Sequence, residues 1–344
     1  MNSEADNLET HAPSITRRAF LHAAAVAAAA PGLGALAAEA VPPPPTGLPR
    51  RILGKTGQEV TILGLGCAYL TMDKEHRNHR AGEAYTRALI ETALDGGIRY
   101  FDVAPNYHQA EVRLGPLLAP VRDKVFLVTK LDHADARGAE EDLTRSLKLL
   151  QTDHVDLLLL HAVGLSTFED LEALQGPRSA LAFLRQARQK GLTRFIGFSS
   201  HPAQIPEQVK LLSDLGADVI QPFINYLSRA ENNLEETLVA AAHQQKLGVV
   251  AMKVLGGQGQ LADDYDRAFR YALSVPGVQC ALIGASSIAE VQRAVKAARD
   301  FRPLTAIEMA ETIALGRKML GGNPKKTAQL RLHYPRDLGE VRWA

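Results

Sequence analysis

The strongest constraint on the fold is a repeated alternation of short apolar runs with segments of helical periodicity. The apolar runs lie at 62–65, 99–102, 125–129, 155–160, 194–198, 218–221, 249–252 and 281–283. The helical segments lie at 83–94, 111–118, 139–150, 179–190, 205–215, 234–245, 265–273 and 288–299. The runs are rich in Val, Ile and Leu, as parallel strands buried on both faces are. Eight strand-then-helix units predict an α/β fold, the closed (β/α)8 or TIM barrel.

Segments on either side of the repeat extend this barrel. An N-terminal β-hairpin is expected around Lys55-Thr56-Gly57 and a helical extension after the last unit, so the predicted domain covers 50–320, followed by a tail at 321–344. An open doubly wound sheet is the alternative, and it usually carries G-x-G-x-x-G after its first strand. Here Gly64-Leu65-Gly66-Cys67-Ala68-Tyr69 lacks the third glycine. The barrel is therefore favoured.

The first forty residues have the pattern of an export signal. Arg17-Arg18 precede an Ala-rich apolar stretch, Ala38-Glu39-Ala40 forms a small-x-small cleavage site, and a Pro-rich linker follows at 41–49. The arginine pair resembles a twin-arginine leader, which implies recognition by the twin-arginine export machinery and a periplasmic location. The apolar part is short, so no stable membrane span is expected after cleavage. A leader that stays uncleaved as a membrane anchor and a disordered or amphipathic extension are the alternatives.

Composition excludes several classes of function. The 39 Lys and Arg against 38 Asp and Glu leave a net charge of +1, which provides no global field to attract nucleic acid. Two cysteines cannot by themselves supply a four-ligand zinc site or an iron–sulfur cluster. Cys67 and Cys280 should lie at opposite ends of neighbouring strands, too far apart for a disulfide. Both are expected to remain thiols.

Polar side chains follow the ends of successive predicted strands, where barrel enzymes place their chemistry. Asp102 ends the second strand and Tyr107 follows it, Lys130 ends the third, and His161 ends the fourth. Any one of them alone would fit a structural role, such as a loop cap or an ion pair. An acid, a phenol, an ammonium and an imidazole on one rim together predict a reactive site.

These four groups suit hydride transfer to a carbonyl coupled to protonation of its oxygen. A tyrosine phenol ordinarily has a pKa of about 10, so Tyr107 needs a nearby positive charge to stabilise its phenolate, which Lys130 could provide. Asp102 would hold Lys130 charged and directed. His161 would donate a hydrogen bond to the carbonyl oxygen. Because no side chain carries a hydride, a cofactor is required.

The order of motifs resembles the aldo-keto reductase family from about Arg51 to Arg299. The matching segments are Arg51 to Gly57, Gly97 to Tyr107, Glu111 with Leu114-Gly115, Val128-Thr129-Lys130, Val155-Asp156-Leu157 before His161, and Arg194 to Ser199. The resemblance implies that Asp102, Tyr107, Lys130 and His161 are catalytic, with Tyr107 as the general acid. It also implies NAD(P)H-dependent reduction of a small-molecule aldehyde or ketone to an alcohol, or the reverse reaction.

The same resemblance implies that a nicotinamide dinucleotide lies extended across the barrel mouth without a Rossmann turn, which agrees with the missing glycine. The residues that resemble its binding positions are Ser199, Gln221, Met252, Leu255, Gly256, Gly284, Ser286, Ser287 and Arg293. Met252 stands where many members place an aromatic ring, and its thioether can pack on the nicotinamide. Met252 and Leu255 would also fit ordinary barrel packing.

NADPH is the expected cofactor, and NADH is the alternative. Glu290 stands where many relatives have Gln or Arg. A carboxylate near a 2′-phosphate would repel it, although Arg293 and Lys296 lie close by in the sequence to compensate.

Two other functions remain compatible with the sequence. A barrel that binds a nucleotide as a sensor or subunit would keep the cofactor residues without needing the set of four. A metal-dependent hydrolase would use Asp102, His161 and His201 as ligands. The first strand carries Cys67-Ala68-Tyr69 rather than an H-x-H pair, so no metal is expected.

Overall fold

The structure is a computed structural model of the full chain. It describes residues 47–70, 82–107, 109–163, 168, 172–200, 206–232, 235–257 and 259–321. The expected leader at 1–40, most of the linker, the tail beyond residue 321 and His201 lie outside the described residues. The part of the chain described below belongs to one compact unit.

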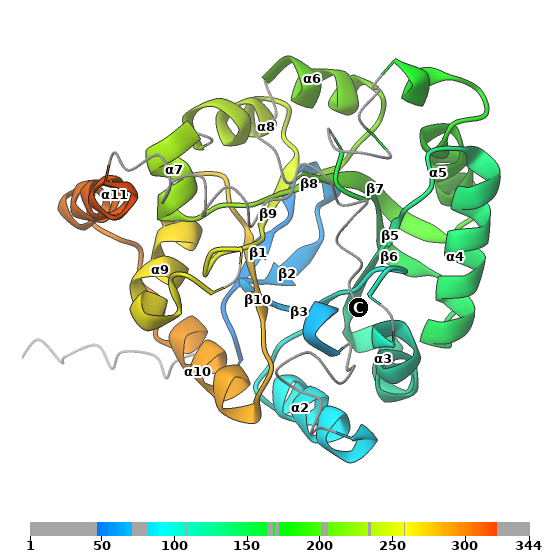
Figure 1. The fold of residues 1–344 in the computed structure, drawn as a ribbon. Coiled ribbons are helices and arrows are strands. Elements are labelled where there is room, and N and C mark those ends of the chain that lie inside the picture. Colours follow the sequence, from blue (N-terminus) through cyan, green and yellow to red (C-terminus); the bar gives the residue numbers. More distant parts are fainter. Residues whose placement is uncertain are drawn as a thin grey trace, which may run out of the picture. The chain divides into compact units, whose positions relative to one another are not determined.

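Eight parallel strands close into a barrel in the order β10-β3-β4-β5-β6-β7-β8-β9 (Figure 1). They are β3 (Leu63–Gly66), β4 (Tyr100–Asp102), β5 (Phe126–Leu131), β6 (Val155–Leu160), β7 (Thr193–Ser200), β8 (Val219–Pro222), β9 (Gly248–Ala251) and β10 (Cys280–Gly284). Gly284 of β10 pairs with Gly66 of β3, which closes the ring. The eight predicted strands are confirmed, with ends that differ by a few residues.

The two strands that carry Ser199 and Gln221 approach each other closely because β7 contains a glycine. A Cβ atom on Gly197 would lie 2.1 Å from the backbone oxygen of Val219 in β8. Any side chain at this position would push the strands apart. Gly197 therefore helps to bring Ser199 opposite Gln221, as the strand register shows.

Helices surround the strands, as Figure 1 shows. They are α2 (Glu83–Asp95), α3 (Ala110–Leu118), α4 (Ala136–Leu150), α5 (Ala180–Gln189), α6 (Pro206–Asp214), α8 (Ala240–Gln244), α9 (Tyr265–Ser274) and α10 (Ile288–Arg299). Short 3-10 turns lie at Gly54–Thr56, Cys67–Leu70, Ala119–Lys124, Ala173–Gln175 and Ala262–Asp264. The helix expected at 234–245 is divided into a π-helical turn, Glu235–Val239, and α8.

Two further helices pack together outside the eight units. These are α7 (Tyr226–Asn232) and α11 (Ala306–Leu320), which lie side by side in Figure 1. A capping box of Thr305 and Glu308 begins α11 and satisfies two backbone N–H groups there. The predicted C-terminal helical extension is confirmed, whereas α7 was not predicted.

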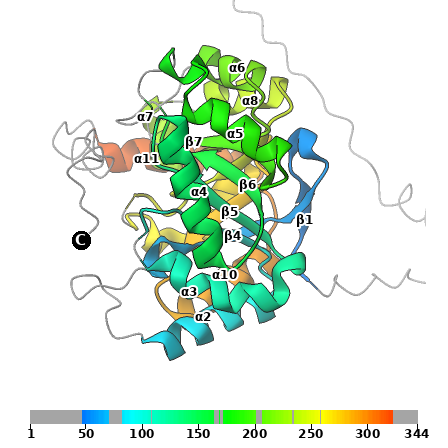
Figure 2. The same ribbon diagram turned by 90° about the vertical axis from the view of Figure 1, so that its right-hand side faces the viewer.

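The N-terminal hairpin closes the amino end of the barrel. Strand β1 (Arg50–Ile52) pairs antiparallel with β2 (Glu59–Thr61). The Lys55 N–H donates to the Lys246 oxygen at 2.7 Å, and Leu53 is fully buried. Figure 2 shows the hairpin at one end of the barrel. The predicted hairpin is confirmed, and it leaves the carboxyl ends of the strands as the open rim.

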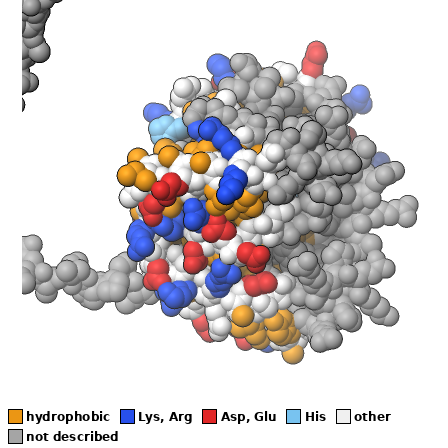
Figure 3. All heavy atoms as spheres, turned by 60° about the vertical axis from the view of Figure 1, so that its left-hand side comes forward, with side chains coloured by type: hydrophobic (Ala, Val, Ile, Leu, Met, Phe, Trp, Pro, Cys, Tyr) orange, Lys and Arg blue, Asp and Glu red, His pale blue; other side chains and the backbone are white. Residues whose placement is uncertain are grey.

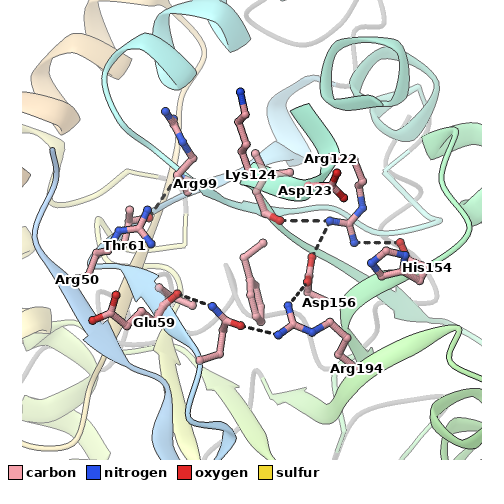
Figure 4. Close-up of a pocket in the computed structure, with 14 residues that line it drawn as sticks. Arg50, Glu59, Thr61, Arg99, Arg122, Asp123, Lys124, His154, Asp156 and Arg194 are labelled. Carbon is pink, nitrogen blue, oxygen red and sulfur yellow. Dashed lines mark hydrogen bonds and ion pairs between the residues drawn. The ribbon is translucent and has the colours of Figure 1, made fainter. Parts of the chain in front are cut away.

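The amino end also carries a charged pocket of about 390 Å³ (Figure 4). At its centre the Asp156 carboxylate lies 2.9 Å from Arg122 and 2.7 Å from Arg194, and it accepts a 2.9 Å hydrogen bond from the Leu127 N–H. Arg194 also donates to the Gln58 side chain at 2.6 Å. The network ties the hairpin to β5, β6 and β7, so its role is structural.

Both cysteines are buried free thiols, as expected. Cys67 follows β3 at the open rim, and Cys280 begins β10 at the closed end. Burial raises the pKa of each thiol, so neither has the thiolate character of a nucleophile.

The surface agrees with the nearly balanced charge of the sequence. On the face shown in Figure 3, basic and acidic side chains are interspersed. No helix within the described ranges is long and apolar enough to cross a membrane.

Candidate active site

A buried ion pair forms the base of the site. Lys130 of β5 points its ammonium at Asp102, the last residue of β4, with 2.8 Å between Nζ and Oδ1. The same ammonium donates to the Val103 oxygen at 2.9 Å. Burial alone would lower the pKa of Lys130, but Asp102 and Tyr107 outweigh it and raise the pKa above its ordinary value. Lys130 therefore stays charged and fixed in direction, as predicted.

Tyr107, in the loop after β4, lies against this ammonium. Nζ of Lys130 is 4.9 Å from the centre of the phenol ring. Burial raises the pKa of Tyr107 to about 12, although the charge of Lys130 and a hydrogen bond with it act in the opposite direction.

The sequence predicts that Lys130 favours the Tyr107 phenolate, and its charge does lower the pKa of Tyr107, but the loss of solvation is the larger effect. The ammonium only limits the rise. Tyr107 is therefore fully protonated near neutral pH, which is the state that a proton donor requires.

His161, immediately after β6, completes the group. Its ring lies edge-on to Tyr107, with 5.9 Å between the ring centres and 77° between the planes. Its Nδ1 lies 2.6 Å from Oδ1 of Asp132. The structure thus brings Asp102, Tyr107, Lys130 and His161 together at one rim.

Asp132 is a functional candidate that the sequence analysis missed. It follows β5 directly. Burial would raise its pKa, but the hydrogen bond and charge of His161, with Lys130, hold it below its ordinary value. A signal was present, because residues two apart in an extended chain share a face. Asp132 is two residues after Lys130.

Lys253 is a second residue that was missed. It follows Met252 at the end of β9 with a φ of 54°. Burial and the neighbouring charge of Lys130 lower its pKa, whereas Asp102 raises it. Its ammonium is therefore close enough to the ion pair to interact with it. Reading the ends of all eight predicted strands, rather than the first five, would have identified it.

Two side chains beside the catalytic group fit a nicotinamide carboxamide. Ser199 and Gln221 are opposite one another on β7 and β8, and each is only 1% exposed. Ser199 Oγ accepts a 3.0 Å hydrogen bond from the Ala162 N–H, which leaves its hydroxyl hydrogen to donate. Oε1 of Gln221 has no hydrogen-bond partner among the described residues. An amide ligand would complement this acceptor and this donor.

The loop after β9 lies next to this wall. Met252 is buried, and its backbone forms a parallel β-bridge with Phe223. Its apolar thioether side chain is of a kind that can pack against a ring. Leu255 packs partly buried against the core. Gly256 has a φ of 83°, and its N–H donates to the Lys253 oxygen at 2.8 Å. The loop makes a tight turn at the rim.

The polar groups in the segment after β10 hydrogen-bond to one another. Gly284 ends β10, and Ser287 is the N-cap of α10, accepting from the Glu290 N–H. Ser286 donates to Glu290 Oε2 from its N–H at 2.6 Å and from its hydroxyl at 2.9 Å. A carboxylate thus already takes up these two donors at the start of α10.

Arg293 contacts α9 rather than Glu290. Its guanidinium lies over the Tyr265 ring, 4.3 Å from the ring centre. It also donates to the Ala262 oxygen. The structure therefore places Arg293 near the segment after β10, in contact with Tyr265 rather than with Glu290, and Lys296 pairs with Asp300.

The metal alternative depends on His201, which lies outside the described residues. Within the described part of the chain, no group of three His, Cys, Asp or Glu side chains is arranged to hold a metal ion. Asp102, one expected ligand, is instead paired with an ammonium.

Comparisons with known sequences agree with this site. A model of the aldo/keto reductase family matches residues 63–269. Aldo-keto reductase AKR2E4 from Bombyx mori is 32% identical over 182 residues, 48% of this chain and 54% of that protein. L-Glyceraldehyde 3-phosphate reductase from Escherichia coli K12 is 29% identical over 238 residues, 62% of this chain and 63% of that protein. The chain thus aligns with about half to just under two thirds of these relatives.

Solved structures share the fold. A protein assigned as an aldo-keto reductase from Pseudomonas aeruginosa has 26% identity and a TM-score of 0.61, covering 73% of this chain and 94% of that chain. Aldo-keto reductase AKR11C1 from Bacillus halodurans has 23% identity and a TM-score of 0.63, covering 78% and 96%, which supports the barrel alone. The family match spans more than half of the chain. The chain therefore belongs to the aldo/keto reductase family.

Proposed function

We propose that this protein is an NAD(P)H-dependent oxidoreductase that reduces a small aldehyde or ketone to an alcohol, or catalyses the reverse reaction. The observation that carries the proposal is the buried Lys130–Asp102 pair packed against the Tyr107 phenol at the open rim. Burying two charges costs folding free energy unless the ions are close and hydrogen-bonded to each other. Here the buried pair places an ammonium beside the protonated Tyr107 phenol, next to the His161 imidazole.

In this proposal the nicotinamide supplies the hydride, and the protein controls the proton. Tyr107 donates its proton to the carbonyl oxygen. Lys130 stabilises the phenolate that remains, and Asp102 keeps Lys130 charged and directed. His161 hydrogen-bonds the oxygen as negative charge develops on it. In the oxidative direction the Tyr107 phenolate, stabilised by Lys130, accepts the proton from the alcohol.

We assign the cofactor residues on the same basis. Ser199 and Gln221 hold the carboxamide, and Met252 packs against the ring. The remaining positions proposed for the diphosphate and adenosine are Leu255, Gly256, Gly284, Ser286, Ser287 and Arg293. NADPH remains the cofactor proposed from the resemblance. The contacts of Glu290 support NADH instead. Its carboxylate accepts the N–H and the hydroxyl of Ser286, and its negative charge would repel the 2′-phosphate that only NADPH carries.

Nucleotide titration followed by a panel of carbonyl compounds tests the function. We expect the full-length protein to bind NADPH or NADH, measured by fluorescence, and to oxidise it when an aldehyde or ketone is added. Nucleotide binding without turnover on any carbonyl would favour the sensor or subunit. Hydrolysis that depends on an added metal, without nucleotide affinity, would favour the hydrolase.

We further propose that residues 1–40 direct export through the twin-arginine machinery, that 41–49 link them to the barrel at 50–320, and that 321–344 form a tail. The support is the Arg17-Arg18 pair before an apolar stretch. Replacement of both arginines by lysine should retain the protein in the cytoplasmic fraction. A periplasmic location unchanged by that replacement would contradict the proposal, and recovery in the membrane fraction would indicate an uncleaved anchor.

A further inference from the structure

We propose that Asp132 is a positioning residue that holds His161 with Nδ1 protonated and turned away from the substrate and with Nε2 available to the carbonyl oxygen. The inference rests on the proposed function for its consequence in catalysis. The pairing itself is a property of the structure alone. Neither the sequence motifs nor the matched family region assigns a role to this aspartate.

The geometry defines which ring nitrogen carries the hydrogen. Nδ1 of His161 lies 2.6 Å from Oδ1 of Asp132. The pKa of Asp132 is below its ordinary value, so the carboxyl is ionised near neutral pH and can only accept. Nδ1 must therefore be the donor. This fixes the neutral ring in the Nδ1–H form, because the partner of one nitrogen selects the tautomer.

The consequence concerns the other nitrogen. In the neutral Nδ1–H form, Nε2 is an acceptor and cannot donate to a carbonyl. His161 can polarise the substrate only as the imidazolium, in which both nitrogens donate. Asp132 thus orients the ring and places a carboxylate 2.6 Å from Nδ1, where it faces that nitrogen when both ring nitrogens carry hydrogen.

The surroundings of Asp132 leave His161 as its main side-chain partner. Oδ2 of Asp132 is buried and has no hydrogen-bond partner among the described residues. The backbone N–H of Asp132 is held separately, by a 2.8 Å hydrogen bond to Asp142 of α4. The main chain is therefore anchored independently of the carboxylate. Changes to the Asp132 side chain should act on His161 before they act on the fold.

Two substitutions separate the contributions of the carboxylate. Asp132→Asn removes the charge and keeps an acceptor, whereas Asp132→Leu removes both at similar volume. We expect kcat for carbonyl reduction to fall roughly tenfold in the first and roughly 100-fold in the second, by analogy with the range found when the carboxylate partner of a metal-binding histidine is replaced. The dissociation constant of the nicotinamide nucleotide should stay within about twofold in both, because Ser199 and Gln221 are unchanged.

The chain offers a matched control at the opposite rim. Asp153 contacts Nδ1 of His154 at 2.7 Å, with 94% of the Asp153 side chain exposed. Asp153→Asn removes a carboxylate from a histidine in the same way but away from the site. We expect it to leave kcat unchanged.

A double-mutant test shows whether Asp132 acts through His161. In a His161→Gln background, Asp132→Leu should cost no more than about twofold further, because the ring that it orients is gone. If Asp132→Leu reduced kcat by the same factor in the His161→Gln background as in the wild type, the proposal would be overturned. A single Asp132→Leu variant with wild-type kcat would also overturn it.

Nitrogen-15 NMR of the histidine rings tests the pairing without any change at Asp132. The His161 signals are assigned by their loss in His161→Gln. We expect the neutral ring of the wild-type protein to be the Nδ1–H tautomer, and an Nε2–H tautomer would overturn the proposal even if the Asp132 variants fail to fold. A wild-type protein that reduces no carbonyl would instead contradict the proposed function, while the tautomer would still decide the pairing.

Discussion

The two ends of the barrel use charged residues in opposite ways. At the amino end, Asp156 is shared by Arg122 and Arg194 (Figure 4), and it accepts the Leu127 backbone N–H. At the carboxyl end, the oxygens Asp102 Oδ2, Asp132 Oδ2 and Gln221 Oε1 are buried without a hydrogen-bond partner among the described residues. Buried polar groups are normally paired. The amino end pairs its carboxylate, although the Tyr100 hydroxyl there also lacks a hydrogen-bond partner among the described residues, whereas the carboxyl end leaves two carboxylate oxygens and one amide oxygen unpaired.

Lys130→Met should have the largest effect at the open rim. It leaves Asp102 buried without its cation, which costs about 3–5 kcal/mol of folding stability. It also removes the charge that stabilises the Tyr107 phenolate, so reduction should fall by about 10³-fold. Urea denaturation and steady-state kinetics measure the two effects. A variant with wild-type activity would show that the ion pair is only structural.

Asp156→Asn is the matching change at the closed end. It leaves two partly exposed arginines without their carboxylate, and we expect a loss of about 2 kcal/mol in the free energy of unfolding. Because the network lies far from the open rim, kcat of the folded protein should stay within about twofold. A large loss of kcat with normal stability would show that the charged network at the amino end also contributes to catalysis.

The ionisation of Tyr107 sharpens the account of the open rim. Burial disfavours the phenolate, so the proton should remain on Tyr107 until the pH approaches about 12. The difference in phenolate absorbance between the wild type and Tyr107→Phe should therefore have its midpoint about two units above that of a free tyrosine. A midpoint below pH 10 would indicate that Lys130 outweighs desolvation.

Glu290→Gln should have the smallest effect. It removes a negative charge from the segment proposed for the adenosine phosphate. The ratio of NADPH to NADH affinity should rise roughly fivefold, as expected for one exposed charge. Fluorescence titration measures both dissociation constants, and Asp300→Asn, at the other end of α10, is the control. An unchanged ratio would show that Glu290 does not face the 2′ position.

The barrel could be predicted from the alternation of strand-like and helical segments, and the four site residues could be predicted from their positions at or just after the strand ends. Parallel strands in a closed ring bring their carboxyl ends together, so reading strand ends identified Asp102, Lys130 and His161, with Tyr107 close behind. The helix α7 was missed because a short helix outside the repeat has too little periodicity to detect.

The remaining features depend on packing. The sequence places Asp132 on the same face as Lys130, but its pairing with His161 of the neighbouring strand depends on how the two side chains pack at the rim. The raised pKa of Tyr107 depends on how much water the folded rim excludes, which residue types and spacing do not specify.

The central claim is that Tyr107 supplies the proton when a bound nicotinamide transfers its hydride. The direct test is stopped-flow measurement of NAD(P)H oxidation by a reducible aldehyde in the wild type and in Tyr107→Phe, with nucleotide affinity measured in parallel. We predict that the phenylalanine variant binds the nucleotide with nearly unchanged affinity and oxidises it about 10³-fold more slowly. Hydride transfer at the wild-type rate in that variant would contradict the claim.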